Sequence, residues 1–171
     1  MKIKFIQDED VVNYKKISMI IGMPYCDGKC WRKLNEKEPG KYDWSLCQNS
    51  SLLNNPIIDI EIETLVERYL NNPLTHAIVF AGMEPLLSQE DMIEFLHELR
   101  AGHECNDDVV IYTGYEEDSD EVVRFIEALH RQKIENVIIK FGRYVPGQTE
   151  HYDSVLGVNL ISWNQYAKKI C

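Results

Sequence analysis

The stretch AIVFAGMEP, residues 77–85, joins an apolar run to a glycine, a carboxylate and a proline. The run AIVF, bounded by turn-forming residues, predicts a buried strand of a parallel sheet. Ligands of α/β proteins gather at the edge where parallel strands end, so Gly82 and Glu84 are expected at such an edge. An ordinary turn from strand to helix explains the same residues equally well at this point.

Similar apolar runs recur along the chain and alternate with amphipathic segments. Strands are predicted at 17–23, 77–80, 109–112 and 137–139, and shorter ones at 2–6 and 155–161. Helices are predicted at 59–71 and 88–100, and a third begins at 119 or 120. The later strands lie about thirty residues apart, the length of one βα unit, which predicts a single α/β domain with a parallel sheet. Periodicity does not decide between an open doubly wound sheet and a partial barrel.

Composition limits the class of protein. The chain has 171 residues, of which 44% are hydrophobic, and a net charge of −10. This acidity argues against nucleic acid as the main partner, because phosphate binding needs a basic surface. No apolar stretch approaches the ~20 residues of a membrane helix, and the first residues, MKIKFIQDED, do not resemble a signal peptide. We therefore expect a cytoplasmic protein without a membrane partner.

Three cysteines lie after the first predicted strand. The segment YCDGKC, residues 25–30, holds Cys26 and Cys30, and sixteen residues separate Cys30 from Cys47. Three converging thiolates can hold zinc together with one further ligand, or an iron-sulfur cluster with one iron left without a protein ligand. The alternative is that some of these residues are small buried hydrophobes.

Together these motifs resemble the radical S-adenosylmethionine enzymes, and within them the small activating proteins of anaerobic ribonucleotide reductase. That family has a Cys-x3-Cys-x2-Cys motif after its first strand and Gly-Gly-Glu-Pro after its second. The corresponding residues here are Cys26, Cys30 and Cys47, with GMEP at 82–85.

Further segments support the narrower resemblance, and others depart from it. The segment YTGY at 112–115 is similar to the family's segment after the third strand, and Ser162, Asn164 and Gln165 resemble its closing motif. Asn49 matches the asparagine after the third cysteine. The departures are an irregular insertion at about 31–46, Met83 in place of the second glycine, and Lys140-Phe141 where the family has an aspartate.

The resemblance implies a fold and a site. The expected fold is a partial (β/α)6-type half-barrel with parallel strands, in which residues 1–171 form one radical S-adenosylmethionine domain. The implied ligands of a [4Fe-4S] cluster are Cys26, Cys30 and Cys47. No further catalytic residue is implied, because the cofactors carry the hard chemistry. The residues implied in S-adenosylmethionine binding are Leu46, Gln48, Gly82, Met83, Glu84, Thr113 and Lys140.

The resemblance also implies an activity. The protein is expected to be an oxidoreductase that takes an electron from a flavodoxin-like donor and cleaves S-adenosylmethionine to a 5′-deoxyadenosyl radical. That radical would install a glycyl radical on a partner enzyme, the large subunit of an anaerobic ribonucleotide reductase. Two alternatives stay open: a radical enzyme acting on a small molecule, and a non-enzymatic binding module in which zinc is closed in by the three cysteines and one further ligand.

Overall fold

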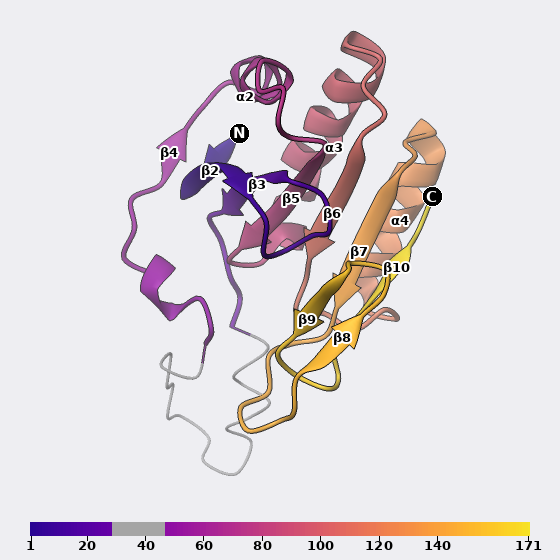
Figure 1. Ribbon diagram of the computed structural model, residues 1–171. Helices are drawn as coiled ribbons and strands as arrows, with labels where there is room; N and C mark the ends of the chain where they lie inside the picture. Colours follow the sequence, from indigo (N-terminus) through magenta and orange to yellow (C-terminus); the bar gives the residue numbers. More distant parts are fainter. Residues whose placement is uncertain (29–46) are drawn as a thin grey trace.

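The computed structural model describes residues 1–28 and 47–171. Cys30, Leu46 and the insertion at 31–46 lie outside this part of the chain. The main sheet has six strands in the order β10-β7-β6-β5-β3-β2 (Figure 1). Its strands are β2 (Phe5–Asp10), β3 (Ser18–Met23), β5 (Ala77–Gly82), β6 (Asp108–Tyr112), β7 (Val137–Phe141) and β10 (Tyr166–Lys169).

The helices and the smaller sheets complete the fold. Two pairs of short strands form separate antiparallel sheets, β1 (Lys2–Ile3) with β4 (Ile58–Asp59) and β8 (His151–Asp153) with β9 (Val158–Leu160). The α-helices are α2 (Ile62–Leu70), α3 (Gln89–His97) and α4 (Asp120–Gln132). Short 3-10 helices span Ser50–Leu52 and Pro85–Ser88, and a π-helical turn, Glu98–Gly102, extends α3. None of the helices in the described ranges is long and apolar enough to span a bilayer.

The sheet is mixed, so the predicted α/β class is confirmed but the expectation of parallel strands throughout is wrong at both edges. Strands β3, β5, β6 and β7 are parallel, whereas β2 pairs antiparallel with β3 and β10 pairs antiparallel with β7. A parallel pair needs a crossover of about a dozen residues or more. Only residues 11–17 join β2 to β3, which is too short for such a crossover.

The three α-helices found within residues 1–28 and 47–171 pack against one face of the sheet. Leu65 of α2, Phe95 of α3 and Phe125 of α4 belong to one buried cluster, together with alternate strand residues such as Ile21 and Phe80. The strand order follows the chain order from β3 to β7, so the sheet is wound in one direction. This excludes the doubly wound alternative, which places helices on both faces.

The opposite face is covered by loops and a hairpin. Its buried residues include Val79 and Val110 of the central strands, Tyr14 of the loop after β2, and Leu160 of β9. Figure 1 shows β8 and β9 lying apart from the helices, next to β7. The pocket described below lies on this face.

Several predicted element bounds are wrong. Asp59 lies in β4 rather than capping a helix, and Glu61 occupies the N-cap of α2. Ser88 does take the N-cap position of α3, but its side chain makes no capping hydrogen bond within the described residues. The strand predicted at 155–161 is β9, which pairs with β8 outside the main sheet, and the sixth strand of the sheet is the unpredicted β10.

Truncation of Phe80 tests the helix-covered core. The Phe80 side chain on the central strand β5 is fully buried, and its ring meets that of Phe95 edge-on at 5.4 Å between centroids. We expect Phe80→Ala to lower the free energy of unfolding by about 3–5 kcal/mol in urea titrations, because it leaves a cavity in a packed core. Leu74→Ala, at a side chain that is 52% exposed, should change it by less than about 0.5 kcal/mol. Similar losses in the two variants would contradict this packing.

Candidate functional site

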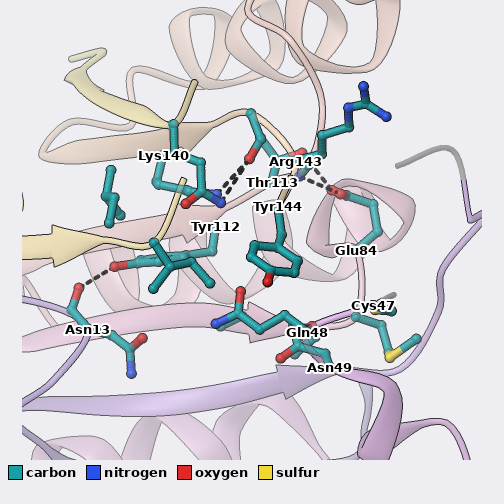
Figure 2. A pocket seen from close by; sticks show the side chains of 18 of the residues that line it. Asn13, Cys47, Gln48, Asn49, Glu84, Tyr112, Thr113, Lys140, Arg143 and Tyr144 are labelled. Carbon is teal, nitrogen blue, oxygen red and sulfur yellow. Dashed lines mark hydrogen bonds between the residues drawn. The ribbon is translucent and has the colours of Figure 1, made fainter. Parts of the chain in front are cut away.

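A pocket of about 330 Å³ lies at the edge where the parallel strands end. Figure 2 shows Cys47, Gln48 and Asn49 along one side of it and Lys140, Thr113 and Arg143 along the other, with Tyr144 between them in this view. All eight of the predicted site residues that the structure describes line this pocket, whereas Cys30 and Leu46 fall outside the described ranges. The eight are Cys26, Cys47, Gln48, Gly82, Met83, Glu84, Thr113 and Lys140.

Glu84 joins the ends of two neighbouring strands. Its Oε1 accepts hydrogen bonds from Thr113 Oγ1 (2.8 Å) and from the backbone N–H of Leu86 (3.1 Å). Its Oε2 accepts from the backbone N–H of Gly114 at 2.9 Å. One carboxylate thus connects the turn after β5 to the turn after β6. A carboxylate has about four lone-pair sites, so acceptor capacity remains at Oε2 for a cationic group.

Burial sets the charge state of Glu84. The residue is 6% exposed, and its removal from water raises the pKa to about 7, against the lowering effect of hydrogen bonds from Gly114, Thr113 and Leu86. The negative charge of Asp27 adds to the rise. Near neutral pH the group therefore exists in both forms, and a bound ammonium group would favour the ionised one.

Cys26 is positioned by contacts on either side of it. The carbonyl of Tyr25 accepts a hydrogen bond from the backbone N–H of Glu84 at 2.7 Å. Asp27 accepts one from the hydroxyl of Tyr115 at 2.9 Å, and burial together with this contact raises the Tyr115 pKa. The backbone N–H of Gly28 donates to Cys26 Sγ at 3.3 Å, a contact that stabilises negative charge on the sulfur.

Cys47 reaches the same strand end through its neighbour Asn49. The side-chain amide of Asn49 donates a hydrogen bond to the carbonyl of Gly82, the last residue of β5. The carbonyl of Cys47 accepts from the backbone N–H of Ser50 at 3.1 Å. Two cysteines that are twenty-one positions apart in the chain are thereby held at one pocket.

The backbone at Gly82 explains why glycine occurs there but not at the next position. Gly82 has φ +90°, and a Cβ at this position would lie 2.9 Å from the backbone nitrogen of Met23. The glycine is therefore required by the close approach of β3, whether or not a ligand is bound. Met83 lies outside the left-handed region and donates its N–H to the Met23 carbonyl at 3.2 Å, so a side chain is tolerated there.

The end of the pocket beyond Thr113 is formed by Lys140 and its neighbours. Lys140 is 5% exposed, and its Nζ donates to the carbonyl of Gly142 at 2.7 Å and lies 5.7 Å from the ring centroid of Tyr112. The Tyr112 hydroxyl donates to the carbonyl of Asn13 at 2.6 Å (Figure 2). Burial raises the Tyr112 pKa, so the ring stays neutral at ordinary pH.

Most of the residues that line the pocket were missing from the predicted site, among them several with polar side chains. Asn13, Tyr112, Tyr144 and Gln165 all line the pocket. Gln165 and Tyr112 lie in segments that carried the family resemblance, which was the available signal for them. Asn13 follows an antiparallel edge strand, and nothing in the local sequence places it here.

The part of the chain that the structure describes holds two of the three predicted cluster ligands at this pocket, Cys26 and Cys47. No group of three His, Cys, Asp or Glu side chains within residues 1–28 and 47–171 is placed to hold a metal ion. The third predicted thiol, Cys30, lies outside these ranges. The two thiols are of the donor type that iron-sulfur clusters use, so the described residues fit such a group in their chemistry.

Comparison with known proteins assigns no family. No protein-family model matches the chain, and no curated protein matches its sequence.

The raised pKa of Glu84 predicts a specific pH dependence. The folded protein holds this proton up to about pH 7, whereas the unfolded chain loses it near 4.5. The contribution of Glu84 to stability is therefore complete below pH 4.5 and is lost as the pH rises to about 7. Urea titrations should show that the stability difference between wild type and Glu84→Gln shrinks, or changes sign, by about 2–3 kcal/mol from pH 5 to pH 8.

The matched control for Glu84→Gln is Glu63→Gln, at an exposed carboxyl in the first turn of α2. This variant should keep the pH dependence of the unmodified protein. The same pH dependence in wild type and Glu84→Gln would mean that Glu84 is already ionised at pH 5.

The hydrogen bond from Asn49 to Gly82 predicts restricted access to Cys47. Asn49→Ala removes this contact, whose net contribution is about 1 kcal/mol, so Cys47 should be alkylated by iodoacetamide about fivefold faster. Mass spectrometry of the digested metal-free protein measures the rate, with Cys105 as internal reference and Asn72→Ala as control variant. Unchanged alkylation of Cys47 would show that the contact does not hold this segment.

Proposed function

We propose that the protein is a radical S-adenosylmethionine enzyme that installs a glycyl radical on a partner enzyme. One observation carries the proposal: Cys26 and Cys47, far apart in the chain, border the same pocket as the buried Glu84. Each cysteine segment also makes its own hydrogen bond near the end of β5, through Tyr25 to Glu84 or through Asn49 to Gly82. Cysteines that only filled space in the core would not need to lie together at the edge where the strands end.

The winding of the sheet supports the proposed fold family. In the described part of the chain, consecutive parallel strands carry α2, α3 and α4 on one face, which is the arrangement found in (β/α) barrels and their fragments. The proposed finer class is a partial (β/α)6-type half-barrel whose interior face carries the pocket. The antiparallel strand β10 beside β7 then ends the barrel before it closes.

Some residues of the pocket would bind the iron-sulfur cluster, and others would bind S-adenosylmethionine. Cys26 and Cys47, with Cys30, would bind three irons as thiolates, and the Gly28 N–H would stabilise charge on the Cys26 sulfur. Glu84 would accept from the amino group of S-adenosylmethionine, and a bound ammonium would keep this carboxyl ionised. When bound, the cluster supplies the electron that cleaves S-adenosylmethionine to a 5′-deoxyadenosyl radical.

The proposed partner is a large glycyl-radical enzyme, an anaerobic ribonucleotide reductase, with a flavodoxin-like protein as electron donor. The pocket volume of about 330 Å³ is at the lower end for small-molecule sites. A macromolecular substrate would therefore present its reacting residue at the mouth rather than occupy the pocket.

Anaerobic reconstitution tests the proposed function. Protein treated with iron and sulfide should be brown, hold about four irons per chain, and form 5′-deoxyadenosine from S-adenosylmethionine when reduced. Cys47→Ala should lose the cluster and the product, whereas Cys105→Ala, a matched change at a cysteine outside the pocket, should keep both.

One result would overturn the proposed function, and another would correct the proposed ligand set. Colourless protein that binds one zinc and forms no 5′-deoxyadenosine would identify the zinc-stabilised binding module instead. A full cluster in Cys47→Ala would mean that another residue is the third ligand.

A further inference from the structure

A buried lysine near the N-terminus, Lys4, contacts the segment that follows Cys47. Lys4 is 8% exposed, and its Nζ donates hydrogen bonds to the carbonyls of Leu53 at 3.1 Å and Asn55 at 2.8 Å. Its side chain makes no ion pair within residues 1–28 and 47–171. A buried charge needs polar partners, so in the described part of the chain these two carbonyls compensate the ammonium.

The backbone of Lys4 is itself fixed to the main sheet. Lys4 lies between β1 and β2, and its N–H donates to the carbonyl of Gly22 in β3 at 2.7 Å. The apolar stem of a lysine packs along buried surface and carries the ammonium group away from the backbone. Lys4 therefore joins the sheet to residues 53 and 55, which belong to no strand or helix.

Backbone hydrogen bonds continue from Leu53 back to Cys47. The 3-10 helix Ser50–Leu52 directly precedes Leu53. The N–H of Leu53 donates to the carbonyl of Ser50, and the N–H of Ser50 donates to the carbonyl of Cys47, both at 3.1 Å. Leu52 and Cys47 both line the pocket. Release of the end of this segment would therefore free the turn that carries Cys47.

A lysine suits this position because of the carbonyls that it meets. Carbonyls at the end of a helical turn have no partner within the turn, and lysine side chains commonly donate to them. Hydrogen bonds from an ionised donor are about twice as strong as those between neutral groups. Residues 47–55 are thus held at both ends, by Asn49 through Gly82 and by Lys4.

We infer that Lys4 is a positioning residue for Cys47, which keeps this thiol at the pocket by holding the end of residues 47–55 against the sheet. The benefit of this position to an iron-sulfur cluster rests on the proposed function, whereas the hold on the thiol does not. Sixteen residues separate Cys47 from Cys30, so the spacing of the cysteines does not fix the position of Cys47. Contacts from elsewhere in the fold must do so.

Alkylation of the metal-free full-length protein by iodoacetamide tests the inference. Lys4→Met keeps an unbranched side chain but loses the donors, so Cys47 should react about tenfold faster, the effect of about one charge-assisted hydrogen bond. Cys26 should react at an unchanged rate, because its segment is held by contacts of its own. A general loss of structure would accelerate both cysteines, so the ratio of the two rates separates positioning from destabilisation.

The matched control is Lys169→Met, on the edge strand β10, where Lys169 Nζ donates to Asn136 Oδ1 at 3.2 Å. This variant should keep the wild-type rate at Cys47. In Lys4→Met/Asn49→Ala the two accelerations should multiply to about fiftyfold, because Cys47 is released only when both ends of its segment open. Thermal unfolding checks that Lys4→Met is folded. If it is not, Lys4→Gln, with an uncharged side chain one bond shorter, replaces it with the same expectation.

An unchanged rate at Cys47, an equal acceleration of Cys26, or a double variant no faster than Asn49→Ala would overturn the inference. Failure of the proposed function gives a different result. Selective acceleration of Cys47 in a protein that stays colourless on reconstitution keeps the positioning role and rejects the cluster. A brown protein that forms 5′-deoxyadenosine but shows no acceleration in Lys4→Met keeps the chemistry and rejects the positioning role.

Discussion

The buried carboxyl group of Glu84 is the contact on which the pocket depends. Beyond the ends of two parallel strands the backbone ladder stops, and side chains must hold the turns together. Glu84 does this by accepting donors from the turns after both β5 and β6, while its own N–H holds the segment before Cys26. The cost is a carboxyl kept away from water, which is seen in its raised pKa.

Much of the central sheet could be predicted from the sequence, because its strands are continuous apolar runs separated by amphipathic helices. The end of each parallel strand then indicated where polar residues would meet. Glu84 and Thr113 do meet there, at 2.8 Å, and the described cysteines Cys26 and Cys47 border the same pocket. Their roles toward iron and S-adenosylmethionine stay predictions.

Other parts of the fold and of the pocket depend on tertiary contacts that leave no signal in the local sequence. The strand β10, with the sequence YAKK, has no alternation of apolar residues that would predict a strand. It is a strand because its backbone pairs with β7. Asn13 reaches the pocket because the loop after β2 crosses the sheet. Gln165 is held at the pocket by the hydrogen bond that its side-chain amide donates to the Gly142 carbonyl. Gly82 was expected at the edge where the strands end and lies there, and the close neighbour that requires a glycine is the backbone of β3.

The division of the sheet into a helix-covered face and a loop-covered face separates stability from recognition. The three helices bury their apolar side chains on one side, and the other side is closed by the loop after β2 and the β8–β9 hairpin. The covering carries a smaller buried cluster of its own, to which Tyr14 and Leu160 belong. A substitution in either covering segment can therefore reshape the pocket without disturbing the cluster that the helices bury.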